Sequence, residues 1–218
     1  MKHLHMEGSA AVRGEPLVAG AASGAVLSAE VGLSFWGGVH PDTGNVIDSF
    51  HPLHEQCIAG KVLVIPSSRG SCTGSQVVLQ ALLNGTAPSA VLVRQLDVTI
   101  AIGAIVAEEF FGRSLPVVHL GDKDFELAMR STHARVDADG TVHLLPATAE
   151  DQPDRAGGDA CAPPVARGSC DADELQLSAD DSAMLDGVHG PAAQAALRVV
   201  CRMARLQRAQ RLVSISQV

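Results

Sequence analysis

One short stretch of the chain combines residue types that could hold and transform a small acidic molecule. Residues 60–75 read GKVLVIPSSRGSCTGS, an apolar run followed by a loop of serines, a threonine and glycines around Arg69. The loop supplies hydroxyl groups, flexible backbone and one positive charge. This combination favours the binding of a carboxylate or a phosphate.

The elements on either side of this loop strengthen the case for an anion site. Residues 62–65 form a short apolar run typical of a strand buried on both faces, and Pro66 ends it. Residues 76–83 have apolar side chains at helical spacing, and Thr73 or Ser75 is suited to cap that helix. The first N–H groups of a helix are unpaired and would point into the loop, where they favour an anion.

Two common phosphate loops are excluded. The loop lacks the glycine–lysine pair of a mononucleotide-binding loop, and no G-x-G-x-x-G motif opens the helix. A tight surface turn rich in small residues explains the pattern equally well. The loop pattern alone therefore leaves two interpretations open, an anion cradle and a plain turn.

Composition indicates one globular domain with an appendage. The chain has 218 residues, of which 46% are hydrophobic and 18% are charged, and domains run at about 100–200 residues. The formal net charge of -8 argues against general binding to nucleic acid or acidic membranes. We find no apolar run of the roughly 18 residues that a membrane span needs, and no secretory signal at the N-terminus. We therefore expect a cytoplasmic protein.

Neither the cysteines nor the histidines form a pattern typical of a metal site. The five cysteines are scattered, odd in number and without a C-x-x-C pair, so reduced thiols are expected. His40, Asp48, His51 and His54 have spacings that fit no compact helix or hairpin site, which favours surface or hydrogen-bonding roles. We expect no metal site formed by this chain alone.

The segment 33–53 is dense in turn residues, and long loops inside a compact domain are often functional. Phe35 and Trp36 stand directly before a Gly-Gly turn. Large aromatic side chains usually anchor cores, and the alternative is that they form a wall of the site. Trp36 and His51 are accordingly included among the candidates for substrate binding.

Alternating apolar strands and helices predict an α/β fold. The pattern predicts strands at 61–65 and 90–94, paired in parallel, and a further strand at 115–120. Residues 100–107 are apolar throughout, and Gly103 indicates a close approach of backbone. Residues 134–136 and 141–145 are predicted to form a hairpin.

The composition changes abruptly after residue 146. Residues 147–176 are poor in large apolar side chains and are predicted to be a disordered linker, with Cys161 and Cys170 as incidental thiols. Residues 177–218 are predicted to be helical, with a long helix over 192–210. Its arginines recur at helical spacing, and on so acidic a chain a solvated helix face is favoured over contact with nucleic acid. We expect this piece to be loosely attached.

Several of these motifs, in the same order, resemble one known family. The chain over about residues 14–145 is similar to the small, swivelling domain of aconitase X, a family of hydro-lyases related to aconitase. The stretches that carry the resemblance are LSFWGGVHPDTGNVIDSFHPL, GKVLVIPSSRGSCTGSQVVLQALLNGTAPSAVLV, IAIGAIVAEE and LPVVHL. The tail from Leu177 resembles the opening of the large catalytic domain of the same family.

The resemblance implies a fold and a domain organisation. The fold is a swivelling β/β/α domain of the aconitase superfamily over residues 1–146, followed by the linker and the short helical segment. Residues 177–218 are then the incomplete start of the large domain, as in fused bacterial members of the family. The large domain is the expected partner, in the same polypeptide or as a separate subunit.

The resemblance also implies the chemistry. Fused bacterial members dehydrate cis-3-hydroxy-L-proline, and two-subunit archaeal members dehydrate phosphomevalonate. A serine of the small domain's Gly-Ser loop is the proton acceptor in the family, and it matches Ser71. From the residues themselves we expect Gly70, Thr73 and Ser75 to shape the carboxylate site and Arg69 to supply charge. The iron or iron–sulfur centre would be bound by cysteines of the large domain, beyond Val218.

Two kinds of function remain to be separated. One is part of a dehydratase that is inactive without its large domain, acting on 3-hydroxyproline, phosphomevalonate or another hydroxy acid. The other is a binding or regulatory module that uses the anion loop without catalysis.

Overall fold

The computed structural model describes residues 10–146, 195, 196, 198–203 and 205. The strands in this part of the chain are β1 (Ala10–Arg13), β2 (Glu15–Val18), β3 (Ala22–Ser28), β4 (Val62–Ile65), β5 (Ala90–Val93), β6 (Val117–His119), β7 (Ser131–Val136) and β8 (Thr141–Pro146). The helices between them are α1 (Gly74–Asn84), α2 (Val98–Phe111) and α3 (Asp122–Met129). The predicted linker and most of the predicted helical tail lie outside the described residues; those described between 195 and 205 are helical.

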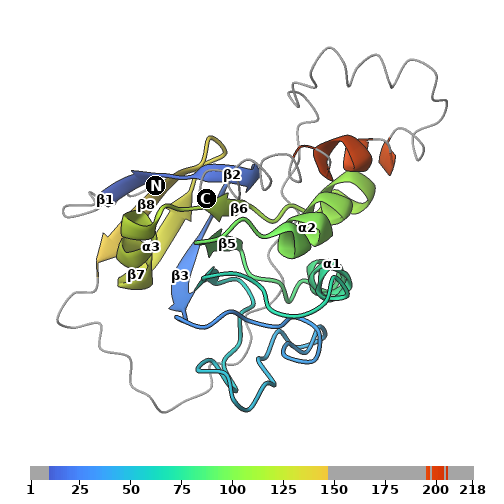
Figure 1. The fold of residues 1–218 in the computed structure, drawn as a ribbon, viewed down its shortest axis with the longest axis horizontal. Helices are drawn as coiled ribbons and strands as arrows, with labels where there is room; N and C mark the ends of the chain where they lie inside the picture. The colour runs from blue at the N-terminus through green and yellow to red at the C-terminus, as the bar shows by residue number, and fades with distance from the viewer. Residues whose placement is uncertain (1–9, 147–194, 197, 204, 206–218) are drawn as a thin grey trace, which may run out of the picture.

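All of these strands join one sheet, in the order β1-β8-β7-β3-β4-β5-β6-β2 (Figure 1). β3, β4, β5 and β6 run parallel, and the flanking strands pair antiparallel with them. The predicted parallel pairing of 61–65 with 90–94 is confirmed, with Val62 opposite Ala90. The carboxyl ends of the four parallel strands therefore meet at one edge of the sheet, where the connecting loops collect.

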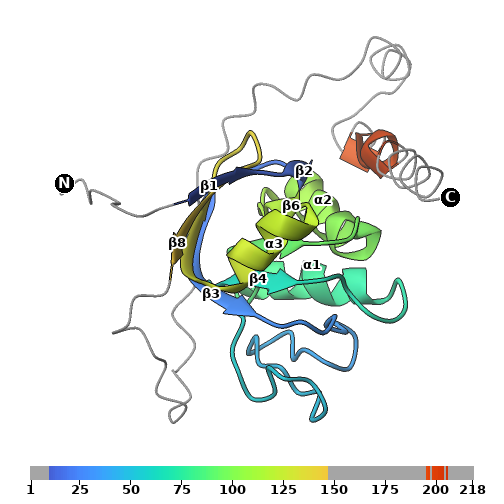
Figure 2. The ribbon, with the colours of Figure 1, turned by 60° about the vertical axis from the view of Figure 1, so that its left-hand side comes forward.

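Gly14 lets one segment join both margins of this sheet. β1 pairs with β8 and β2 pairs with β6, and Gly14 is the residue between them. A Cβ at Gly14 would lie 2.3 Å from Val118 Cγ1 and 2.6 Å from the carbonyl oxygen of His119. Since only a residue without a side chain can turn this corner, the glycine allows the sheet to curl until it is nearly closed, as Figure 2 shows.

Each central strand contributes to two cores. Leu63 and Ile65 of β4 belong to the core under α1 and α2, whereas Val62 and Val64 belong to the core under α3. Side chains alternate across a strand, so a strand covered on both faces must be apolar at every position. This explains the unbroken apolar run that predicted β4.

Close packing of α1 on α2 depends on Gly103. A Cβ at this position would lie 2.6 Å from the carbonyl oxygen of Ser75 and 2.9 Å from Val78 Cβ. The close approach predicted for Gly103 is therefore confirmed. The predicted hairpin is also confirmed, as β7 and β8. No helix in the described part of the chain is long and apolar enough to cross a membrane.

The arginines of the tail differ from prediction. Arg198 and Arg202 do not form a solvated face, because both pair with carboxylates of α2. Val199 is buried between them in the core that α1 and α2 share. These contacts argue against the predicted loose attachment, which amide hydrogen exchange would test.

Candidate functional site

The loop that follows β4 lies beside the segment that follows β3. Leu33 and Ser68 form an isolated parallel bridge, and the N–H of Arg69 donates to the carbonyl oxygen of Leu33 at 3.0 Å. The two segments thus continue the parallel pairing of β3 and β4 past the end of the sheet. Ligands of α/β proteins commonly bind in this position, outside the carboxyl ends of the strands.

Ser71 is exposed and caps the turn that leads into α1. Its Oγ accepts the N–H of Thr73 at 3.1 Å and donates to Thr73 Oγ1 at 2.8 Å. The backbone N–H groups of Gly74, Ser75 and Gln76 donate to the carbonyls three residues earlier, so a tight helical turn begins at Ser71.

Thr73 occupies the N-cap position of α1, as one of the two predicted alternatives, but the predicted side-chain capping bond is not made. Thr73 makes no side-chain capping bond, and the hydroxyl of Ser75 donates back to the carbonyl oxygen of Cys72 at 2.7 Å. The extra tight turn moves the first unpaired N–H groups towards Ser71. This turn was not visible in the apolar pattern, which starts only at Gln76.

Gly70 gives the loop a conformation that other residues rarely adopt. Its φ is +96°, in the region that favours glycine. A Cβ here would also lie 3.3 Å from Ser34 Oγ, which itself donates to the carbonyl oxygen of Trp36 at 2.8 Å. Ser34 is thus a loop neighbour that the sequence did not single out. Gly70 sets the direction in which Ser71 projects.

Arg69 is paired. Its Nη2 lies 3.1 Å from Asp48 Oδ2, and the side chains of Arg69 and Asp48 are 51% and 19% exposed. The pair joins the loop to the long segment between β3 and β4. Asp48 therefore neutralises part of the charge that was predicted for the site, while the exposed guanidinium keeps donors that face solvent.

The two aromatic residues before the Gly-Gly turn have separate roles. Phe35 is 1% exposed and belongs to the core, as expected for a large aromatic side chain, whereas Trp36 is 62% exposed. The start of α1 packs against both, because a Cβ at Gly74 would lie 3.7 Å from Phe35 Cβ and 4.0 Å from the backbone nitrogen of Trp36. Trp36 is the one of the pair that remains available to a ligand beside the loop.

His51 is a scaffold residue. It is 3% exposed. Its Nδ1 accepts the N–H of Leu53 at 3.1 Å, and its Nε2 lies 3.2 Å from the carbonyl oxygen of Val31, to which it donates. Both ring nitrogens are thus used by backbone, which leaves His51 no polar atom for the substrate contact that was predicted for it.

Asp97 anchors the loop that follows β4, and this role was not predicted from the sequence. It is 5% exposed, and its carboxylate accepts the N–H groups of Ser68 and Ile100, the latter at 3.0 Å. One side chain therefore caps α2 and ties down the loop after β4. A signal was present, since an aspartate directly before an apolar helical run is typical of an N-cap.

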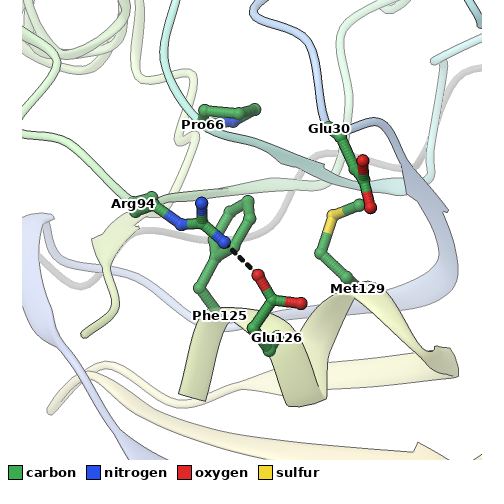
Figure 3. Close-up of a pocket in the computed structure, with 6 residues that line it drawn as sticks. All are labelled: Glu30, Pro66, Arg94, Phe125, Glu126 and Met129. Carbon is green, nitrogen blue, oxygen red and sulfur yellow. Dashed lines mark hydrogen bonds and ion pairs between the residues drawn. The ribbon is translucent and has the colours of Figure 1, made fainter. Parts of the chain in front are cut away.

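A pocket of about 220 Å³ lies where the ends of β4 and β5 approach α3 (Figure 3). Arg94 lies over the ring of Phe125, 4.5 Å from its centroid, and pairs with Glu126 and Asp122. Glu30 adds another carboxylate to the lining. Because Glu126 and Asp122 already pair with the Arg94 guanidinium, this pocket is a poor receptor for an anionic substrate.

Metal ligands do not gather in the described part of the chain. No group of three or more His, Cys, Asp or Glu side chains is placed there to hold a metal ion. Cys57, Cys72 and Cys201 are reduced thiols in separate places. These described residues therefore do not supply the donor set of an iron or iron–sulfur centre.

Family models match two parts of the chain. The model described as aconitase X swivel domain matches residues 11–144, and the model described as aconitase X first domain matches residues 174–218. A crystal structure titled Thermococcus kodakaraensis aconitase X, holo-form, has a TM-score of 0.54 and 36% identity, covering 62% of this chain and 98% of that one.

Curated relatives of two kinds are similar to the chain. A cis-3-hydroxy-L-proline dehydratase of Pseudomonas aeruginosa is 46% identical over all of this chain, which covers 35% of that protein. A phosphomevalonate dehydratase small subunit of Methanothermobacter thermautotrophicus is 44% identical over 55% of this chain and 88% of its own length. The chain thus spans about a third of the length of the dehydratase that it matches throughout.

Proposed function

The chain belongs to the aconitase X family, and we propose that it is the swivel-domain part of a hydro-lyase that dehydrates cis-3-hydroxy-L-proline. The observation that carries this proposal is the extent of the similarity to the hydroxyproline enzyme, which runs through the tail as well as the domain. In this proposal residues 1–146 form the swivel domain, 147–176 link it to the next domain, and 177–218 begin the large catalytic domain.

The reaction needs a base at the carbon next to a carboxylate. Removing that proton and the hydroxyl group of the neighbouring carbon releases water and leaves a carbon–carbon double bond. We assign the proton acceptor to Ser71. Its hydrogen bonds to Thr73 support this role, because an N–H donor and a helix N-terminus both stabilise a serine oxygen that has lost its proton.

The substrate carboxylate is proposed to bind to the loop around Ser71. Ser71, Thr73 and Ser75 place three hydroxyl groups at the start of α1, where the helix dipole favours an anion. Arg69 adds a positive charge that Asp48 holds in place. Trp36 would close one side of the site, and His51 would stabilise the segment that carries it.

The departure of hydroxide needs an electrophile that these residues do not supply. We propose that the large domain provides it, as an iron or iron–sulfur centre. The swivel domain then contributes the base and the carboxylate site, and neither domain is active alone.

An assay of the complete enzyme with two substrates tests the proposal. We expect turnover of cis-3-hydroxy-L-proline and none of phosphomevalonate. Turnover of phosphomevalonate alone would instead support the activity named for the second type of relative, to which the swivel domain is also similar. Turnover of neither, combined with anion binding at the loop, would identify a module without catalysis.

A further inference from the structure

The described tail residues form a helix that lies beside the carboxyl end of α2 (Figures 1 and 2). Arg198 Nε lies 2.6 Å from Glu109 Oε2, and Arg202 Nη1 lies 2.9 Å from Glu109 Oε1. Arg202 Nη2 also lies 2.8 Å from Glu108 Oε2. Two guanidinium groups and two carboxylates are therefore joined in one cluster of ion pairs.

Glu109 and Arg202 in this cluster are largely out of water, whereas Glu108 and Arg198 are 25% and 32% exposed. The side chain of Glu109 is 6% exposed and that of Arg202 is 10% exposed. Charged side chains at this level of burial are stable only when each has its partner, because an unpaired buried charge is strongly disfavoured. The pairing is thus needed by both sides of the contact.

An apolar contact accompanies the charges. Val199 is 8% exposed and belongs to the core that α1 and α2 share, and Met203 packs against that core. Ala195 and Val199 are four residues apart, as are Arg198 and Arg202, so one side of the helix carries both kinds of contact. The contact therefore has an apolar centre and a charged margin.

The position of the two glutamates on α2 points to a partner. They lie in the last turns of the helix, where the macrodipole disfavours negative charge. No basic residue occurs in that last turn to compensate. The arginines of the tail supply the missing positive charge, so the domain without its tail would carry two carboxylates at an unfavourable place.

We propose that Glu108 and Glu109 are the docking surface for the first helix of the neighbouring domain, and that this contact is the pivot on which the swivel domain turns. The proposal rests on the proposed function, and on the match of residues 174–218 to the first domain of the family. Asp97, which holds the Ser71 loop, and Glu109 lie at opposite ends of α2, about 18 Å apart along the helix axis. A contact there lies at the end of α2 that is far from the Ser71 loop, as a pivot requires.

The test is hydrogen exchange and kinetics on the complete enzyme with Glu109→Gln, Arg202→Gln and the double variant. We expect protection of the amides in residues 195–205 to fall at least about tenfold in each single variant, because each leaves a charge unpaired. The double variant should be less affected than the sum of the two single variants. Glu126→Gln, which breaks an ion pair on α3, is the matched control and should leave this protection unchanged.

The kinetic part of the test addresses the pivot. We expect kcat to fall in the single variants while the circular dichroism spectrum and the Ser71 loop's own exchange are retained. Unchanged exchange in residues 195–205 would overturn the docking surface, and altered exchange with unchanged kcat would overturn the pivot. Failure of the proposed function is distinguishable, because the exchange measurement needs no substrate and the wild-type assay reports the substrate independently.

Discussion

Ser71 combines a structural role with the proposed chemical one. Its hydroxyl caps the turn before α1 through the N–H of Thr73, and the same hydrogen bond stabilises the deprotonated oxygen that a base requires. A serine oxygen held in this way has one bond from an N–H and one to another hydroxyl, and its remaining lone pair faces solvent. The two roles can be separated by measuring stability and activity on the same variant.

We expect Ser71→Ala in the complete enzyme to lose about 1 kcal/mol of unfolding free energy, as for other lost helix caps. Turnover of cis-3-hydroxy-L-proline should fall far more, by about 10²–10⁴-fold, the usual contribution of a positioned base. Urea unfolding and steady-state kinetics give the two values. Ser131→Ala is the control, since it removes a serine hydroxyl that donates to the carbonyl oxygen of Leu127 at the end of α3. Near-normal turnover of Ser71→Ala would refute the base assignment.

Asp97 holds the loop after β4 and the start of α2 in place through two backbone hydrogen bonds. Replacing it by alanine leaves the N–H groups of Ser68 and Ile100 without their carboxylate acceptor. We expect a loss of about 2–3 kcal/mol of unfolding free energy, the range for buried hydrogen bonds to a charged group. Asp97→Asn retains one acceptor oxygen and should lose less. Equal urea midpoints for wild type and Asp97→Ala would contradict this role.

At the scale of elements, α1 begins directly after the Ser71 loop and packs closely on α2 at Gly103. We expect Gly103→Ala to cost about 1–3 kcal/mol, because the added methyl group overlaps Ser75 backbone and Val78, and this overpacking outweighs the gain in helix propensity. Gly121→Ala is the control: its Cβ would meet nothing within 4 Å, and we expect a change below about 1 kcal/mol. Thermal unfolding of the two variants compares them directly.

The turn between β7 and β8 contains two carboxylates that resist protonation. The hydrogen bond from Arg135 lowers the pKa of Asp137 below 3.8, and the hydrogen bonds from the backbone and side chain of Thr141 lower the pKa of Asp139 below the same value. A lowered folded-state pKa adds stability that is complete above the unfolded-state value and is lost as pH falls through the folded-state one. Both groups therefore stabilise the hairpin at neutral pH.

We expect the amides of this hairpin to exchange faster as pH falls below 3.8, after correction for intrinsic rates. Thr141→Val removes the side-chain donor to Asp139 while the backbone donor stays, so the pKa of Asp139 should rise part of the way towards 3.8. A carboxyl-carbon NMR titration measures the shift. An unchanged pKa in Thr141→Val would show that the backbone bond alone is responsible.

Prediction from sequence succeeded where the residues of a single element are enough to determine its secondary structure. Residues 62–65 and 90–93 are short runs that are apolar at every position and bounded by turn residues, a pattern typical of central strands. Prediction failed where two distant segments decide together. The corner at Gly14 depends on Val118, and the burial of Arg202 depends on Glu108 and Glu109. Neither partner can be chosen without the order of strands in the sheet.

The candidate site divides in the same way. The loop and Ser71 were identified from the residues and from the family resemblance. The tight turn that makes Ser71 the cap, the pairing of Arg69 with Asp48 and the burial of His51 arise from packing between segments. Side-chain exposure separated Phe35 from Trp36, although both are large aromatic residues at adjacent positions.

For the whole molecule, both cores are formed almost entirely by residues before the tail. Among the described residues, Val199 and Met203 are the tail's contribution to the core under α1 and α2, and the core under α3 contains none of the tail. We expect a chain shortened to residues 1–146 to fold, with an unfolding free energy lower by about 1.5–3 kcal/mol for the lost burial of Val199. Urea unfolding followed by circular dichroism measures this loss.

A peptide of residues 192–210 provides the complementary measurement. Added to the shortened chain, it should shift NMR signals of α2 and restore part of the lost stability, because it returns the arginines and Val199 to their partners. A peptide with Arg198 and Arg202 replaced by glutamine should have little effect. A shortened chain that is unfolded, or one as stable as the full chain, would contradict the division of the core.

The corner at Gly14 also has a consequence for biosynthesis. The first described strand pairs with the last, Ala10 opposite Leu144, and the next strand pairs with β6. The ribosome releases β1 and β2 more than a hundred residues before it releases β8, a delay on the order of ten seconds at ordinary rates of translation. During that interval the nascent chain carries strands without partners, and contacts of such long sequence separation form slowly. Nascent β1 and β2 are therefore the segments on which we expect a ribosome-associated chaperone to act.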